Sequence, residues 1–310
     1  MTGLVPASLR PPAELFRLPV RLPQGPVFRS PAAPADGLSL RSGQPTRSQT
    51  NVPLFDQVDT GADPAYQALA KGVWYSDSLR TRENALVHVL KVDPRRADLV
   101  PVFDQRAKSL EPAALANQGL LAAINANFFT GSAIIGDLKD GGRIWRDDAL
   151  PAVDRRSDHW YHVGITQDGQ VETGNGGLSE TGHETRFRSF MGGFPQLFSR
   201  SQFARLDADI ASGAFARRMP YHGANLTDAI SRSFLGVTAD GQVLLLATGA
   251  GEQRSKGATL EEAARLLRGL GAVEAYILDG GGSTSMMVQG RMAAGTDGRK
   301  VKAYLGIRPR

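Results

Sequence analysis

Short segments of alternating apolar and polar residues recur along the chain, and this period of two predicts β-strands. The clearest is residues 85–93, which stops at Pro94. Two hairpins are predicted where such segments flank Asp168-Gly169 and Asp240-Gly241, because Asp-Gly readily forms a tight hairpin turn. The two hairpins have similar sequences, which indicates an internal duplication or the same turn chemistry used twice. Further strands are predicted at residues 120–125 and 301–307, with a turn at 140–142.

A helical period is rarer in this sequence. Residues 260–270 place Leu and Ala at every third or fourth position, with Thr259 and Glu262 in the spacing of a capping box. A second, short helix is predicted from Ser109 to about Gln118. Strands therefore outnumber helices, and we predict an α+β fold with a mainly antiparallel, curved sheet, hairpins and a few packed helices.

The first part of the chain has a different composition from the rest. Residues 1–50 hold nine of the 18 prolines and six arginines, opposed only by Glu14 and Asp36, and they show no periodicity. We therefore predict a Pro/Arg-rich extended N-terminal arm over residues 1–71, able to contact a partner or another subunit. The folded domain is predicted over residues 72–310, and it begins with an apolar segment at Gly72.

Composition narrows the class of protein. With 310 residues, 41% of them hydrophobic and 22% charged, the chain is long enough for a large core. No apolar run approaches the ~18 residues that span a membrane, and no signal peptide is visible. The absence of cysteine excludes disulfides and thiolate chemistry. The net charge is +5, but the arginines occur in scattered pairs, so we predict no nucleic-acid partner.

One segment carries most of the chemical information. After the apolar residues 275–278 come Asp279, the three glycines Gly280, Gly281 and Gly282, three hydroxyl side chains and a second apolar stretch. Glycine permits positive φ and close approach to the backbone, at an entropic cost within a strand-loop-strand unit. We therefore predict a ligand-binding loop in which backbone N–H groups and a carboxylate line the floor of a pocket.

Simpler interpretations of this segment stay open. Gly-Gly-Gly-Ser is also a linker sequence, although linkers seldom lie between two apolar strands, and a wide hairpin without function is a further alternative. Two catalytic motifs are excluded. No Gly-Lys-Ser/Thr follows the glycines, so the segment is not a phosphate-binding P-loop. Ser285 stands where a nucleophile elbow needs its last glycine.

Four motifs, in the same order along the chain, resemble the phosphodiester glycosidase family. Residues 124–129, Ile-Asn-Ala-Asn-Phe-Phe, resemble its Ile-Asn-Gly-Gly-Tyr-Phe signature, and residues 231–236 resemble its Arg-Thr-Ala-Val-Gly strand. Residues 257–263 resemble its Gly-Ala-Thr-Leu-x-Glu helix start, and residues 278–283 match its Leu-Asp-Gly-Gly-Gly-Ser hallmark. The resemblance covers residues 72–310. Asn-Ala-Asn replaces Asn-Gly-Gly, and Phe194 is inserted in the usual Gly-Gly-Pro stretch.

The resemblance implies a hydrolase that cleaves a sugar-1-phosphodiester on its glycosidic side, so that the sugar is released and a phosphomonoester remains. The implied substrate is a carbohydrate phosphodiester in a glycan or surface polymer, such as an exopolysaccharide of the cell envelope. The resemblance also implies an extracytoplasmic location, although no signal peptide is seen. The sequence requires no cofactor.

Such a reaction needs anion recognition, proton transfer and stabilisation of an oxocarbenium-like centre. Asp279 and Glu262 are the candidate acid and base, because a helix antiparallel to the following strand has its N-terminus beside the end of that strand. The Arg232 guanidinium suits phosphate oxygens, and the glycines offer N–H groups for an anion nest. The candidate substrate-binding residues are Asn125, Asn127, Arg232, Gly280, Gly281, Gly282, Ser283 and Ser285.

Several of these candidates also have a structural interpretation. Arg232 suits a surface salt bridge, the capping box accounts fully for Glu262, and Asn125 is a common turn residue at the end of a strand. A metal site is compatible with the sequence, although no spacing demands one. Asp279, Asn125 and Glu262 offer the oxygen ligands that calcium or magnesium prefers.

Two other functions stay open at this point. A glycan- or envelope-binding module without catalysis would keep the same fold, and the basic arm and the altered Asn-Ala-Asn motif favour it. A general nuclease or phosphodiesterase is suggested by the net charge alone. The enzyme hypothesis differs from both because it expects Asn125, Arg232 and Glu262 to converge on one cleft with Asp279.

Overall fold

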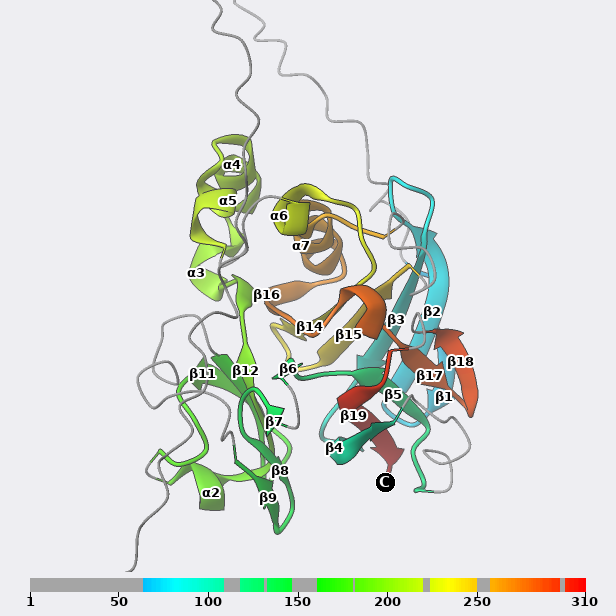
Figure 1. Ribbon diagram of the computed structural model, residues 1–310, viewed down its shortest axis with the longest axis vertical. Coiled ribbons are helices and arrows are strands. Elements are labelled where there is room, and N and C mark those ends of the chain that lie inside the picture. The colour runs from blue at the N-terminus through cyan, green and yellow to red at the C-terminus, as the bar shows by residue number, and fades with distance from the viewer. Residues whose placement is uncertain are drawn as a thin grey trace, which may run out of the picture. The chain divides into compact units, whose positions relative to one another are not determined.

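The computed structural model (Figure 1) describes residues 64–108, 118–130, 133–146, 161–180, 182–219, 224–249, 257–295 and 299–310. The predicted helix from Ser109 and the first 63 residues of the predicted arm lie outside these ranges. Every pairing between the described strands is antiparallel, and helices are few. The structure therefore confirms the predicted α+β fold with its curved, mainly antiparallel sheet.

The largest sheet has seven strands. In spatial order they are β1 (Gln67–Ala70), β2 (Val73–Arg80), β3 (Leu86–Val92), β15 (Val243–Thr248), β14 (Arg232–Thr238), β16 (Ala272–Ile277) and β13 (Gln196–Phe198). The strand predicted at residues 85–93 is β3, and the second predicted hairpin is β14–β15. Strand β1 precedes the predicted domain start at Gly72 and pairs with β2.

The central strands β14 and β15 of this sheet are buried on both faces, which explains why they show little polar alternation. Leu235 and Leu245 belong to one hydrophobic core. Phe234 and Leu246 point the opposite way and pack in a second core with helix α7 (Leu260–Gly269). Each fully buried side chain of this size contributes ~1.5–3 kcal/mol of hydrophobic stabilisation, so the sheet is fixed from both sides.

Helix α7 begins and ends where the sequence predicts. Thr259 is its N-cap, because the threonine Oγ1 accepts the N–H of Glu262 at 3.1 Å. Gly271, with φ of 94°, follows its C-terminal end. The predicted capping box is only half formed, since the Glu262 carboxylate accepts the backbone N–H of Arg82 at 2.7 Å. Capping therefore does not account fully for Glu262, contrary to that interpretation of the sequence.

Two further sheets have five strands each. The first consists of β18 (Arg291–Ala294), β17 (Met286–Val288), β5 (Ala122–Asn125), β19 (Val301–Pro309) and β4 (Ala97–Lys108). The second, in green in Figure 1, consists of β11 (Val171–Asn175), β10 (Tyr161–Thr166), β12 (Phe187–Phe194), β8 (Leu138–Asp140) and β9 (Arg143–Trp145). A separate two-stranded pair is β6 (Phe129–Thr130) with β7 (Ala133–Ile134). The strands predicted at 120–125 and 301–307 are thus β5 and β19, and the turn predicted at 140–142 joins β8 to β9.

The two hairpins with similar sequences also share their turn. In the β10–β11 turn, Thr166 Oγ1 donates to the Asp168 carboxylate and accepts the N–H of Gln170 at 2.9 Å. In the β14–β15 turn, Thr238 makes the same two contacts with Asp240 and with the Gln242 N–H. The same local hydrogen bonds therefore close both hairpins.

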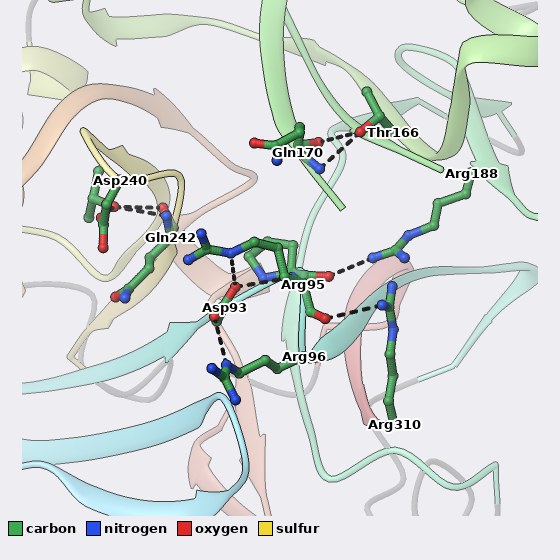
Figure 2. A network of polar contacts seen from close by, with 11 residues as sticks. Asp93, Arg95, Arg96, Thr166, Gln170, Arg188, Asp240, Gln242 and Arg310 are labelled. Carbon is green, nitrogen blue, oxygen red and sulfur yellow. Dashed lines mark hydrogen bonds and ion pairs between the residues drawn. The ribbon is translucent and has the colours of Figure 1, made fainter. Parts of the chain in front are cut away.

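A third turn, which follows β3, lies beside these two (Figure 2). Asp93 Oδ1 accepts the backbone N–H of Arg95 at 3.1 Å and the Nε–H of the same residue at 2.8 Å. A Cβ on Gly169 would lie 3.0 Å from the Arg95 Cα, so the β10–β11 turn approaches it closely. Arg188 and Arg310 donate to the backbone carbonyls of Pro94 and Arg95. Elements of all three large sheets therefore meet at these turns. This place lies at the C-terminal end of β14, whereas Arg232 lies at the N-terminal end of that strand.

No element was predicted for residues 199–227, which hold most of the remaining helices. Ser199 and Gln202 form a complete capping box at α3, a pattern that could have been recognised. None of the helices in the described part of the chain is long and apolar enough to cross a membrane. The helices other than α7 are α2 (His183–Arg186), α3 (Arg200–Phe203), α4 (Leu206–Ala211), α5 (Ala214–Arg218) and α6 (Ala224–Thr227).

Candidate active site

Asp279 follows strand β16 and lies where two sheets meet. Just before it, the N–H of Leu278 donates to the Ser233 carbonyl in β14 at 3.0 Å. The N–H of Asp279 itself donates to the Ala126 carbonyl, which follows β5, at 2.8 Å. We call residues 279–285 the Asp279 loop. Its first residue is thus attached to the seven-stranded sheet on one side and to the β5 sheet on the other.

The carboxyl group of Asp279 has a pKa that is unusually high for an aspartate. The residue keeps partial exposure to solvent, yet burial of its carboxyl raises the pKa to about 6. The Ser283 hydroxyl, the Gly280 N–H and the positive charge of Arg299 lower the pKa, but less than burial raises it. A carboxyl with this pKa can both donate and accept a proton near neutral pH, as an acid–base catalyst must.

Asn125, the last residue of β5, contacts both ends of the Asp279 loop. Its Nδ2 donates to the Asp279 carbonyl at 2.5 Å. Its Oδ1 accepts the Ser233 hydroxyl at 2.6 Å and the Ser285 N–H at 2.9 Å. The side chain is fully buried. The structure therefore brings Asn125 to Asp279, as predicted, but through the loop backbone rather than through the carboxylate.

Gly280 and Gly281 differ in whether the fold requires a glycine at that position. Gly280 has an extended backbone, and a Cβ there would only reach ordinary contact, 3.5 Å from Arg232 Cα. Gly281 has φ of 59°, but a Cβ there would meet nothing within 4 Å. The N–H of Gly280 donates to the Asp279 carboxylate, and the N–H of Gly281 donates to the Ser231 carbonyl. A Cβ at Gly280 would not clash with its neighbours, so packing does not require a glycine there. The missing side chain leaves room next to Asp279.

The three hydroxyls after the glycines are buried and unequally satisfied. Ser285 Oγ donates to the Ser283 carbonyl at 3.1 Å. Ser283 Oγ and Thr284 Oγ1 have no hydrogen bond of standard geometry in the structure. Ser283 nevertheless lowers the pKa of Asp279, so its hydroxyl lies close to the carboxylate. Thr284, which sequence reasoning omitted from the site, is thus as unsatisfied as Ser283; its place in the Ser-Thr-Ser run was the available signal.

Arg232, the first residue of β14, is almost fully buried beside the loop. Its Nε donates to the Ala258 carbonyl at 2.8 Å, and its Nη2 donates to the Asp228 carbonyl at 3.1 Å. These bonds attach the start of β14 to the segment that leads into α7. The backbone of Arg232 lies near Gly280, but the one arginine whose charge shifts the pKa of Asp279 is Arg299.

Glu262 lies on the first turn of α7 and does not contact Asp279. Its carboxylate is buried and accepts the Arg82 N–H in the connection between β2 and β3. Burial raises the pKa of Glu262, although the Arg82 N–H and the Arg82 charge act in the opposite direction. Glu262 is not among the groups that shift the pKa of Asp279. The structure thus does not pair the two candidate carboxylates directly, and a catalytic role for Glu262 stays a prediction.

The contact to Arg82 leads to a test of Glu262. We expect Glu262→Ala to lower the free energy of unfolding by about 2 kcal/mol, because it leaves a cavity and an unpaired N–H. Glu262→Gln keeps an acceptor oxygen and should stay within about 1 kcal/mol of the parent in urea denaturation at pH 7. Loss of turnover in a stable Glu262→Gln protein would instead support the predicted role as a base.

Asn127 replaces a glycine of the resembled motif and is fully buried. Its Nδ2 donates to the carbonyls of Ile135 and Gly192, at 3.0 Å and 2.7 Å. At this point two chain segments cross so closely that a Cβ on Gly136 would lie 2.2 Å from the Gly192 oxygen. Asn127 therefore holds this crossing together, and its contacts do not reach the Asp279 loop.

The three residues that offer oxygen ligands for a metal, Asp279, Asn125 and Glu262, all accept hydrogen bonds from within the protein. Among the described residues, no three His, Asp or Glu side chains lie together in a way that could hold a metal ion. Asn125 Oδ1 already accepts two hydrogen bonds, which occupies both of its lone pairs.

Comparison with known proteins now identifies the family. A sequence model of the phosphodiester glycosidases matches residues 118–308, which is more than half of the chain and includes all four motifs around Asp279. The chain belongs to the phosphodiester glycosidase family. No curated protein matches the chain in a separate comparison. The match confirms the resemblance inferred from the motifs at residues 124–129, 231–236, 257–263 and 278–283.

Solved structures support the same fold for this phosphodiester glycosidase. The catalytic domain of zebrafish N-acetylglucosamine-1-phosphodiester α-N-acetylglucosaminidase, described as auto-inhibited by its pro-peptide, is 17% identical, with a TM-score of 0.56. That alignment covers 77% of this chain and 82% of the zebrafish domain. A hypothetical protein from Synechocystis is 16% identical with a TM-score of 0.53. This alignment covers 80% of the chain but only 64% of the Synechocystis protein.

Proposed function

We propose that this phosphodiester glycosidase hydrolyses the glycosidic bond of a sugar-1-phosphodiester in a glycan or surface polymer, with Asp279 as the group that transfers the proton. The observation that carries the proposal is the carboxyl of Asp279, whose pKa is raised to about 6 beside a glycine loop with room for a ligand. Membership in the family supports the general type of reaction.

The chemistry of the leaving group fits this carboxyl. Cleavage of the C1–O bond releases a phosphomonoester whose second pKa is about 6. A donor with a similar pKa gives up its proton to that oxygen with little free-energy cost, which is the condition for efficient general acid catalysis. At pH 7 a carboxyl with a pKa of about 6 is protonated in about a tenth of the molecules, whereas an aspartate with an ordinary pKa is protonated in about one in a thousand.

Recognition of the diester is proposed for the groups on the open side of the loop. Gly280 and Gly281 provide space for close approach, and the Ser283 hydroxyl is a donor without a partner of standard geometry. Arg232, whose Cα lies near Gly280, is proposed to contribute the positive charge that favours an anionic substrate. The contacts of Asn127 and Ser285 support a structural use for these two residues.

A glycan-binding module without catalysis is the second candidate. The observation that favours it is how many polar groups of the motifs are already satisfied within the protein, namely those of Asn125, Arg232, Gly280, Gly281 and Ser285. On this interpretation the motifs are retained to hold the fold, and the carboxyl of Asp279 would contribute only to binding.

An isotope experiment separates these functions. We expect the protein in H₂¹⁸O to convert a methyl diester of a sugar 1-phosphate into free sugar and methyl phosphate, with ¹⁸O in the sugar. Incorporation of ¹⁸O into the phosphate instead would mean P–O cleavage and would identify a phosphodiesterase. Hydrolysis of a bis-aryl phosphodiester, which has no sugar, would point the same way. Binding of a phosphodiester-containing polymer without release of product would favour the binding module.

A further inference from the structure

We infer that Asn125 is a positioning residue, whose amide fixes the Asp279 loop against β5 and β14, rather than a group that binds the substrate. This inference concerns the site on which the proposed function rests. It differs from the interpretation of the sequence, which placed Asn125 among the residues that contact sugar or phosphate.

The contacts of the Asn125 amide span the loop from end to end. Nδ2 donates to the carbonyl of Asp279, the first residue of the loop, at 2.5 Å. Oδ1 accepts the N–H of Ser285, the last residue, at 2.9 Å. The main chain adds two more bonds, from the Asp279 N–H to Ala126 and from the Asn125 N–H to Ser285. Both ends of the loop are thus held by two consecutive residues.

Ser233 connects a third element, strand β14, to Asn125 and the Asp279 loop. Its hydroxyl donates to the Asn125 Oδ1 at 2.6 Å, and its side chain, like that of Asn125, has no exposed surface. The carbonyl of the same serine accepts the N–H of Leu278. The start of β14, the end of β5 and the Asp279 loop are therefore joined through one amide and one hydroxyl. Sequence reasoning did not include Ser233 in the site.

The amide has little capacity left for a ligand. Its oxygen has two lone pairs, and both accept hydrogen bonds from within the protein. A substrate would have to displace one of these bonds and open a fully buried position, which costs the unpaired group ~1–3 kcal/mol.

Asparagine is also the residue that suits this place, because the site needs a donor and an acceptor on one short side chain. A carboxylate would place a negative charge opposite the Asp279 carbonyl oxygen, and an apolar side chain would leave that carbonyl and the Ser285 N–H unsatisfied. The consequence is that the orientation of Asp279, and with it the burial of its carboxyl, depends on Asn125.

The experiment compares Asn125→Ala and Ser233→Ala with Asn127→Ala. Asn127 is a matched control, since it is equally buried, two residues away, and donates to backbone carbonyls outside the Asp279 loop. The first readout needs no substrate: the pKa of Asp279 is measured by ¹³C NMR in the full chain with labelled aspartate. Asp279→Asn identifies the signal.

We expect Asn125→Ala to lower the pKa of Asp279 by about one unit, because a loosened loop admits water to the carboxyl. Ser233→Ala should shift the pKa in the same direction by less, whereas Asn127→Ala should leave it unchanged even if it melts at a lower temperature. In the isotope assay substrate, Asn125→Ala should lower kcat by ~10–100-fold, as expected for a misplaced catalytic group, with KM within about threefold.

Two outcomes would overturn the inference. A rise in KM with an unchanged kcat and an unmoved pKa would mean that Asn125 binds substrate. A loss of stability with an unmoved pKa, as in the Asn127 control, would mean a merely structural role. If the parent protein hydrolyses no phosphodiester, the proposed function fails, but the NMR comparison still decides whether Asn125 positions Asp279. Ser233→Ala, which removes one hydroxyl, keeps the test informative if Asn125→Ala does not fold.

Discussion

Replacement of Asp279 by Asn should lower kcat for the sugar-1-phosphodiester by ~10²–10⁴-fold, the usual contribution of a positioned acid or base. Asn has nearly the same shape and keeps an oxygen for the Gly280 N–H, so the loop contacts persist. What the variant loses is the acidic proton of the carboxyl group. The measurement is single-turnover and steady-state hydrolysis of the substrate used in the isotope experiment.

The pH profile tests which role Asp279 has. Burial raises its pKa to about 6, so the protonated form persists up to that pH. If Asp279 is the general acid, kcat/KM should fall as the pH rises through about 6, and this limb should be missing in the residual activity of Asp279→Asn. A limb that rises through the same pH would show that the carboxylate acts as a base, and a flat profile would contradict proton transfer by this residue.

The stability of the same variant provides the control. The direction of the pKa shift determines whether the variant is more or less stable than the parent at a given pH. Because the folded pKa lies above the ordinary value of 3.8, folding favours the protonated carboxyl. The corresponding stabilisation is present below pH 3.8 and is lost as the pH rises to about 6. Asn does not ionise, so Asp279→Asn should be more stable than the parent at pH 8, by about 1–3 kcal/mol, and similar at pH 3.5. An inactive variant that is less stable at pH 8 would indicate damage to the fold.

Replacement of Gly257 by Ala should lower the free energy of unfolding by about 3–5 kcal/mol. A Cβ at this position would lie 2.0 Å from the Ile230 carbonyl oxygen and 2.6 Å from the Ser231 nitrogen. These atoms belong to the backbone that precedes Arg232, and the N–H of Ala258 donates to that same carbonyl at 3.1 Å. A movement of either segment would break this hydrogen bond between Ala258 and Ile230, so the clash cannot be relieved without a loss of stability.

The matched control for Gly257 is Gly142→Ala. Gly142 lies in the turn between β8 and β9, and a Cβ there would meet nothing within 4 Å. Both substitutions remove the same backbone freedom of glycine, but only Gly257→Ala introduces a steric clash. Thermal unfolding should show a loss of ~10 °C or more for Gly257→Ala and a change of a few degrees at most for Gly142→Ala. Equal melting temperatures would mean that the bridge between Ile230 and Ala258 yields readily.

The elements with strong local signals were predictable from the sequence. The Asp-Gly hairpins, the strand that stops at Pro94, and the amphipathic helix from Leu260 all depend on residues close together in the chain. The Asp279 loop was found for the same reason, since a carboxylate followed by three glycines is unusual between two apolar strands. Family motifs could be recognised because their residues are contiguous.

The partners of the site residues could not be predicted in this way. Glu262 bonds to Arg82 and Asn125 bonds to Asp279, across 180 and 154 positions of the chain. Residue type indicates that an amide or carboxylate needs partners, but not whether substrate or protein supplies them. The same limit applies to Arg232, whose bonds to Ala258 and Asp228 depend on how β14 packs beside the approach to α7.

The burial of β14 and β15 on both faces limits where substitutions can change which ligand the protein selects. A side chain in the middle of β14 or β15 cannot reach a substrate, because hydrophobic neighbours cover it from either side. We therefore expect ligand selectivity to depend on connections at the strand termini, such as residues 126–128 and 279–285, rather than on the middle of these strands. Directed evolution libraries in those connections that keep Asn127, Asp279 and Ser285 should alter ligand choice while the scaffold stays intact.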